Sequence, residues 1–138
     1  MSVEVNKQVA RSMWQAVAAG DWTAMGAAYA ENATYHGSGP TELRGREQLV
    51  GLAQGYKAAL PDLSITPMHV LADGDLVCTW VRLSGTNTGP LGGNPPTGRK
   101  VSLVVANVVR VVDGKVAEDW ECFDQLDLHR QLGHAASV

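Results

Sequence analysis

Three polar side chains stand within or at the end of apolar segments, where they could carry out proton transfer. Asp124 ends an alternating segment, Asn107 interrupts a run of valine and alanine, and His36 follows Ala33-Thr34-Tyr35. A carboxyl group removed from water prefers its neutral form, so its pKa rises toward the range where it can accept and return a proton near neutral pH. A neighbouring amide or imidazole could donate a hydrogen bond to a substrate oxygen.

The alternation of residues 115–124 predicts that Asp124 points into the protein. One alternate set consists of Val116, Glu118, Trp120, Cys122 and Asp124, whereas the other is mainly polar and consists of Lys115, Ala117, Asp119, Glu121 and Phe123. Successive side chains of a strand lie on opposite faces of the sheet, so we expect the first set to face an apolar interior. Aspartate is also a preferred helix N-cap, and capping a helix that starts near residue 126 is the alternative role of Asp124.

Other side chains are expected to complete this interior site. In residues 100–112, Asn107 shares an otherwise apolar face with Val101, Leu103, Val105 and Val109. A buried amide must be hydrogen-bonded, so Asn107 either has a structural partner or contacts a ligand. We expect His36 at the mouth of the pocket as a proton donor or substrate anchor, and we expect substrate contacts from Trp120, Glu118, Val105, Trp14 and Tyr35.

Two periodicities predict the elements that position these residues. Apolar positions at helical spacing predict helices over 4–19 and 22–30 and a third helix that ends at Pro61. Alternating, β-branched segments predict strands at 33–36, 64–72, 75–86, 100–112 and 115–124, and a closing helix at 125–133. Asp-Gly pairs at 73–74 and 113–114 favour hairpins between consecutive strands. The order predicts one α+β domain over residues 1–138, with three N-terminal helices packed on a curved, mostly antiparallel sheet that encloses a pocket.

Composition and charge exclude several classes of protein. The 138 residues carry a formal net charge of −3 and show no cluster of lysine and arginine, which argues against nucleic-acid binding. The most apolar stretch, 103–109, is far shorter than the roughly 20 residues of a membrane-spanning helix, and residues 1–21 do not resemble a secretory signal. Cys78 and Cys122 lie inside predicted strands and lack metal-ligand spacing, so we expect buried thiols, no metal site and a cytoplasmic protein.

Strand 75–86 predicts an interface between two copies of the chain. Leu76, Cys78, Trp80 and Arg82 share one face, and Val77, Thr79, Val81 and Leu83 share the other. If the second face lines the pocket, Trp80 lies outside beside an arginine, a combination typical of interfaces. We therefore expect a homodimer through the convex side of the sheet; the alternative is a Trp80 covered by the C-terminal segment of its own chain.

Several motifs spread over nearly the whole chain resemble the SnoaL-like polyketide cyclase family of the nuclear-transport-factor-like superfamily. They include Tyr35-His36-Gly37, the segment 42–47 (ELRGRE), the turn 60–63 (LPDL), the glycine-rich segments 85–90 and 96–99, and Asp113-Gly114-Lys115 followed by Glu118, Trp120 and Asp124. The resemblance implies a conical α+β barrel. It also implies that the aspartate of the Trp-x-x-x-Asp motif, Asp124 here, is the acid and base of an intramolecular aldol condensation that uses no cofactor.

The leading hypothesis is therefore a cofactor-free cyclase or isomerase that acts on a hydrophobic carbonyl compound. Asp124 would remove a proton from a carbon flanked by carbonyl groups, and Asn107, Trp120 or His36 would stabilise the developing enolate. The superfamily also contains epoxide hydrolases and steroid isomerases, so Asn107 with Asp124 could instead position a water molecule. A non-catalytic protein that binds a small molecule in the same pocket is the third alternative.

Overall fold

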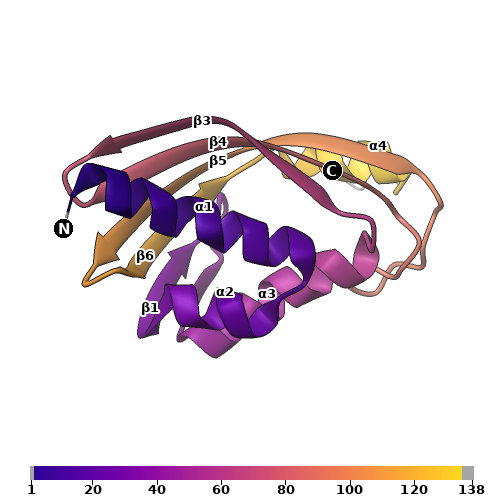
Figure 1. Cartoon of the computed structure of the whole chain (residues 1–138). Coiled ribbons are helices and arrows are strands. Elements are labelled where there is room, and N and C mark those ends of the chain that lie inside the picture. The colour runs from indigo at the N-terminus through magenta and orange to yellow at the C-terminus, as the bar shows by residue number, and fades with distance from the viewer. Residues whose placement is uncertain (1, 135–138) are drawn as a thin grey trace.

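The computed structural model describes residues 2–134 as four helices and a six-stranded sheet (Figure 1). In chain order the elements are α1 (Val3–Ala19), α2 (Trp22–Ala28), β1 (Tyr29–His36), β2 (Glu42–Arg44), α3 (Arg46–Ala59), β3 (Ser64–Asp73), β4 (Leu76–Thr86), β5 (Lys100–Val112), β6 (Lys115–Cys122) and α4 (Gln125–Leu132). No helix in the described part of the chain is long and apolar enough to cross a membrane.

Local signals in the sequence set the ends of the helices. The Ser2 hydroxyl accepts a hydrogen bond from the backbone N–H of Val5 at the start of α1, and the Asp21 carboxylate accepts one from Ala24 in α2. Gly20 ends α1 in the left-handed conformation, with φ of 69°, which glycine adopts without a steric penalty. Pro61 follows the C-cap of α3, and a proline cannot continue a helix.

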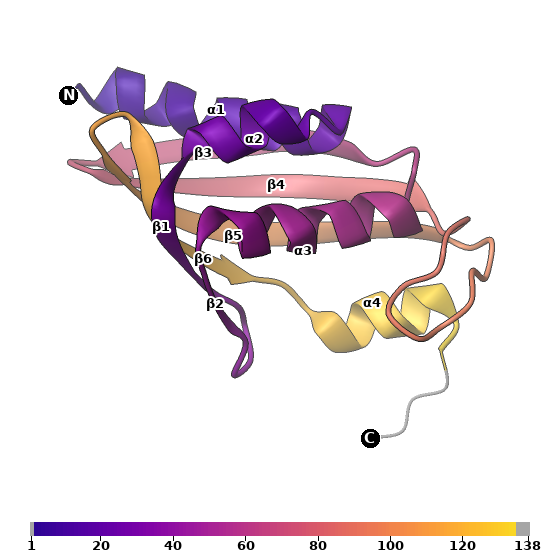
Figure 2. The ribbon, with the colours of Figure 1, turned by 90° about the horizontal axis from the view of Figure 1, so that it is seen from below.

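The sheet has the strand order β2-β1-β6-β5-β4-β3, and its only parallel pair within residues 2–134 is β1 with β6. Both predicted hairpins are confirmed, because β3 pairs antiparallel with β4 across Asp73-Gly74 and β5 pairs with β6 across Asp113-Gly114. Helices α1, α2 and α3 lie together over one face of the sheet (Figure 2). The α+β class and the three N-terminal helices on a mostly antiparallel sheet are thus confirmed, whereas the short strand β2 was not predicted.

A β-bulge in β6 changes which of its side chains face the helices. Arg110 of β5 pairs with Glu118, but the next residue, Val111, pairs with Val116, so β6 contains one extra residue at this point. An extra residue transfers every following side chain to the opposite face. Val116 is therefore buried, and after the bulge the inward positions are Asp119, Glu121 and Phe123.

The faces of β4 and β5 are as the sequence predicted. Val77, Thr79 and Val81 of β4 are fully buried against the helices, together with Val105 and Asn107 of β5. The side chain of Trp80 is 43% exposed on the opposite side, which is called the outer face below. The alternative in which the C-terminal segment of the chain covers Trp80 is not seen within residues 2–134.

Candidate active site

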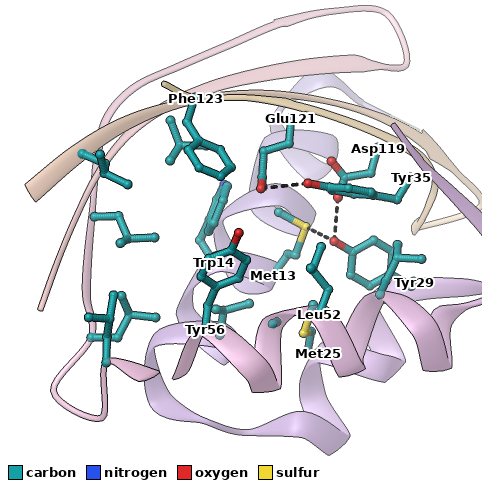
Figure 3. Close-up of a pocket in the computed structure, with 18 of the residues that line it drawn as sticks. Met13, Trp14, Met25, Tyr29, Tyr35, Leu52, Tyr56, Asp119, Glu121 and Phe123 are labelled. Atoms are coloured by element: carbon teal, nitrogen blue, oxygen red, sulfur yellow. Dashed lines mark hydrogen bonds between the residues drawn. The ribbon is translucent and has the colours of Figure 1, made fainter. Parts of the chain in front are cut away.

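A largely apolar cavity lies between the helices and the inner face of the sheet (Figure 3). Its lining comes from all four helices, from β1, β4, β5 and β6, and from the turn that follows α3. The side chains that line it are Met13, Trp14, Val17, Met25, Tyr29, Tyr35, Leu49, Leu52, Ala53, Tyr56, Leu60, Leu63, Leu83, Leu103, Val105, Asp119, Glu121, Phe123 and Leu128. Among residues 2–134 the lining contains two carboxyl groups and no lysine, arginine or histidine.

The two carboxyl groups belong to Asp119 and Glu121, which lie two residues apart on the inner face of β6. Both receive hydrogen bonds from tyrosines of the neighbouring strand β1. The Tyr29 hydroxyl donates to Asp119 Oδ2 at 2.7 Å, and the Tyr35 hydroxyl donates to Glu121 Oε1 at 3.0 Å. The parallel pairing of β1 with β6, which sets Tyr35 beside Asp119 in the ladder, brings these four side chains together.

The second carboxylate oxygen of Asp119 receives a hydrogen bond from Asn107, which lies outside the cavity lining. Its amide nitrogen donates to Asp119 Oδ1 at 2.5 Å and to the Trp120 carbonyl oxygen at 3.1 Å. The Trp14 indole N–H donates to Thr79 Oγ1 at 2.9 Å, so the Thr79 hydroxyl hydrogen is available for Asn107 Oδ1, 3.3 Å away. An indole nitrogen can only donate, so it sets the direction of the whole chain of hydrogen bonds. The amide therefore presents N–H to Asp119.

The surroundings separate the proton affinities of the two carboxyl groups. Burial raises the pKa of Asp119 to about 6, although the hydrogen bonds from Tyr29 and Asn107 favour its charged form. Burial, together with the negative charge on Asp119, raises the pKa of Glu121 to about 8, although the hydrogen bond from Tyr35 favours its charged form. Burial thus favours retention of a proton by the pair near neutral pH, and the two hydrogen bonds to Asp119 make it the group that gives up its proton more readily.

Some of the predicted site residues lie where the sequence placed them. Trp14, Tyr35 and Val105 line the cavity, as expected of its walls. Asn107 is 1% exposed and faces inward, but it is not among the lining residues, because Asp119 separates it from the cavity. The sequence left open whether this amide bonds to a structural partner or contacts a ligand. The structure shows a structural hydrogen bond, to Asp119.

The prediction that Asp124 points into the cavity is wrong. Asp124 lies beyond the end of β6, is exposed, and caps α4, where its carboxylate accepts a hydrogen bond from the backbone N–H of Asp127 at 2.9 Å. The physical reason is the bulge in β6, which reverses the alternation on which the prediction rested. The alternative role, an N-cap of the final helix, is the one observed.

The inward placement of Glu118 and Trp120 is wrong for the same reason, and His36, expected at the mouth of the pocket, does not lie there either. The structure brings these three residues together, but on the outer face. The His36 ring stacks on Trp120 with ring centroids 5.6 Å apart, and His36 Nε2 lies 3.0 Å from Glu118 Oε2. None of them lines the cavity. His36 follows Tyr35 in β1, so its side chain points to the opposite side of the sheet from the tyrosine that bonds to Glu121.

Sequence reasoning missed Asp119, Glu121, Tyr29 and Tyr56 as residues of the site. The alternation places Asp119 and Glu121 on the same face as Lys115, and this mainly polar set was expected to face solvent. One signal was present: Phe123, a large apolar residue, belongs to that same alternate set, so this set is not uniformly polar. No residue type marks Ala117 as the site of a bulge, and so the sequence did not predict the change of face.

The chain matches the family model of the SnoaL-like polyketide cyclases over residues 7–132. This match covers most of the sequence, and the α+β fold around an apolar cavity agrees with it. The chain therefore belongs to the SnoaL-like polyketide cyclase family.

Individual relatives include characterised and structurally solved bacterial proteins. The chain is 32% identical over 93 residues to the aklanonic acid methyl ester cyclase DnrD of Streptomyces peucetius, a match that covers 67% of this chain and 64% of the relative. IdmH of Streptomyces antibioticus, a putative polyketide cyclase, is 30% identical with a TM-score of 0.82 over 93% of this chain and 98% of its own. AclR of Streptomyces galilaeus, a putative hydroxylase, is 26% identical with a TM-score of 0.86 over 99% and 86%.

Proposed function

We propose that the protein is a cofactor-free cyclase or isomerase in which Asp119 is the general base and Glu121 the general acid. The observation that carries the proposal is the pair of buried carboxyl groups in one apolar cavity, with their pKa values on either side of neutrality. Two neighbouring groups with separated proton affinities can supply a base and an acid at the same time. This assignment replaces the expectation that Asp124 is the acid and base, because Asp124 caps α4.

The proposed reaction is an intramolecular aldol closure. Asp119 removes a proton from a carbon between two carbonyl groups, and the resulting carbanion forms a C–C bond to a ketone carbon of the same molecule. The C=O π bond opens to an alkoxide, which takes the proton of Glu121. The reaction leaves Asp119 protonated and Glu121 ionised, and transfer of one proton between these neighbours restores the starting state. An apolar cavity would hold the chain-like substrate in the folded shape that reacts.

The chemistry of the lining supports a hydrophobic, uncharged carbonyl compound as the substrate. Within residues 2–134 no basic side chain lines the cavity, so a free carboxylate would meet Asp119 and Glu121 without a counter-charge. DnrD is a cyclase of a methyl ester, a carbonyl compound whose acid group is masked. We propose a polyketide-like ester as the substrate class for this chain.

Paired substitutions test the two roles. Asp119→Asn and Glu121→Gln are expected to lower kcat on a cyclisable polyketide ester by at least about 100-fold, the usual contribution of a general acid or base. The matched controls are Glu118→Gln on the outer face and Asp124→Asn at the N-cap of α4, which remove a carboxyl group from the same region without touching the cavity. Both controls are expected to retain the wild-type rate. Turnover by Asp119→Asn at that rate would exclude a proton-transfer role for Asp119.

Other reactions in the same cavity give different products. Epoxide hydrolysis needs polar groups that position water, and Asn107, the expected amide, sits behind Asp119 and is not presented to the cavity. Double-bond isomerisation of a steroid-like ketone would use the same two carboxyl groups. Product analysis in ¹⁸O-labelled water separates these cases, because only hydrolysis incorporates solvent oxygen. A protein that merely binds its ligand would return it unchanged.

We propose that a second copy of the chain covers the outer face. Leu71 and Trp80 are 66% and 43% exposed there, and Cys78, Val108 and Trp120 continue an apolar row across the sheet. Arg82, Arg110 and Glu118 flank this row, so the surface carries both signs of charge and can be complementary to itself about a two-fold axis. Light scattering should give twice the chain mass for the wild type and a monomer for Trp80→Asp. A wild-type protein of monomer mass would disprove the dimer.

We also propose a cytoplasmic location. Cys78 is half-buried and Cys122 is exposed, so the expectation of two buried thiols is wrong. Both thiols are free, which fits a reducing compartment. Recovery of the protein from the periplasmic or secreted fraction of the producing cell would contradict this proposal.

A further inference from the structure

The cavity contains one tyrosine hydroxyl that its own protein leaves without a partner. Besides the protonated Glu121, four lining side chains among the described residues carry an N–H or O–H donor: Trp14, Tyr29, Tyr35 and Tyr56. The first three donate to Thr79, Asp119 and Glu121. Among residues 2–134, the Tyr56 hydroxyl forms no hydrogen bond. A donor directed into an otherwise apolar cavity is the kind of group that orients a polar atom of a ligand.

Tyr56 lies on the wall opposite the carboxyl pair. It belongs to α3, and its side chain extends from this helix toward the sheet that carries Asp119 and Glu121 (Figure 3). Its ring packs edge to face against Phe123, with ring centroids 6.4 Å apart, which limits the directions that the hydroxyl can take. A ligand between α3 and β6 would therefore contact the hydroxyl on one side and the carboxyl groups on the other.

We propose that the Tyr56 hydroxyl donates a hydrogen bond to the substrate carbonyl oxygen on which negative charge develops when Asp119 removes the proton. This inference rests on the proposed function and adds the group that stabilises the enolate. A fixed donor at such an oxygen favours the transition state over the ground state, because the oxygen becomes more negative as the proton leaves.

The environment of Tyr56 keeps its hydroxyl in the donating form. Burial raises its pKa, and the negative charge of Glu121 raises it further. Tyr56 therefore remains protonated even where Glu121, with a pKa of about 8, has lost its proton. This difference allows an experiment to distinguish the two possible donors on opposite walls of the cavity.

The test compares two rigid probes that differ in one atom position. 2-Acetylnaphthalene has a ketone oxygen, and 2-isopropenylnaphthalene has a CH₂ group in its place. Tryptophan fluorescence gives Kd for each probe with the wild type and with Tyr56→Phe, at pH 7 and pH 9. We expect the wild type to bind the ketone about fivefold more tightly than the alkene, the effect of one neutral hydrogen bond. We expect the preference to persist at pH 9 and to disappear in Tyr56→Phe at both pH values.

Three outcomes would overturn the inference. The wild type could show no preference for the ketone, Tyr56→Phe could retain the preference, or the wild type could lose it at pH 9, which would identify Glu121 as the donor. The infrared C=O stretch of the bound ketone is a second measurement, with a lower frequency expected in the wild type than in Tyr56→Phe. The alkene is the matched control for packing, since its Kd should not change. None of these measurements requires turnover, so failure of the proposed function would appear separately, in the Asp119 and Glu121 variants.

Discussion

Asp119 and Glu121 occupy similar positions on one strand and yet hold their protons with different strengths. The difference comes from their partners. Asp119 receives hydrogen bonds from Tyr29 and from the Asn107 amide, whereas Glu121 receives one from Tyr35 and lies beside the Asp119 charge. Hydrogen bonds to a carboxylate favour its ionised form, and a neighbouring negative charge disfavours it. The direction of the Trp14, Thr79 and Asn107 hydrogen bonds thus favours the ionised form of Asp119.

Removal of the Asn107 amide should move the protonation of Asp119. In Asn107→Leu, Asp119 loses a donor to its charged form, so we expect its pKa to rise from about 6 by about one pH unit. The activity should follow a bell-shaped pH profile with limbs near 6 and 8 in the wild type, and the acid limb should move upward in the variant.

Carbon-13 NMR titration of the carboxyl groups measures the same shift without a substrate. Thr79→Ser is the matched control, because it keeps the hydroxyl that bonds to Asn107 Oδ1. An unchanged Asp119 titration in Asn107→Leu would contradict the role assigned to this amide.

At the scale of the elements, one extra residue in β6 explains why the predicted side-chain directions are right in β5 and wrong in β6. Residues 100–110 pair with β4 without a break, so their alternation correctly placed Val105 and Asn107 on the inner face. The same reasoning failed for β6, because the bulge near Ala117 moves Glu118 and all later residues to the other face. Bulges arise from pairing between strands and leave no reliable mark in the sequence of one strand. The fold was therefore predictable from periodicity and the Asp-Gly turns, and the face of β6 that lines the cavity was not.

A close approach between two segments gives a prediction at this scale. Gly89 follows β4 and lies against the C-terminal end of α3, where a Cβ atom would come within 1.9 Å of the Ala58 carbonyl oxygen. Its backbone N–H also donates to the Ala59 carbonyl. We expect Gly89→Ala to lower the free energy of unfolding by about 2 kcal/mol or more, since backbone must shift.

Gly93→Ala is the matched control for Gly89→Ala. It lies in the same loop, and nothing within 4 Å would meet its Cβ. Urea denaturation monitored by circular dichroism compares the two variants. Equal stability of Gly89→Ala and Gly93→Ala would show that the loop does not pack closely against α3.

For the whole molecule, the buried carboxyl pair should make folding stability depend on pH. Burial raises the pKa values of Asp119 and Glu121 to about 6 and about 8 in the folded protein, above the values of about 4 expected in the unfolded chain. Between about pH 4 and pH 8 the folded state then binds more protons than the unfolded state. The free energy of unfolding should therefore fall as the pH rises through this range.

Glu121→Gln should remove much of this pH dependence. A glutamine stays neutral at every pH, so we expect the variant to melt at least about 5 °C above the wild type at pH 8.5 and near it at pH 5. Calorimetry at both pH values measures the difference, and Glu47→Gln, at the exposed start of α3, is the control. A wild-type melting temperature that rises from pH 5 to pH 8.5 would contradict a buried, proton-binding pair.

The parallel pairing of β1 with β6 has a consequence for how the protein folds. Tyr29 and Tyr35 lie in the first strand, β1, whereas their hydroxyls bond to residues of the last strand, β6, with sequence separations of 90 and 86 residues. Contacts between such distant segments form slowly, because a long loop must first close. During synthesis, the chain must be made at least as far as Glu121 before Tyr35 can reach its partner. The cavity that these contacts build should therefore form late in folding, at the same time as the native state rather than ahead of it.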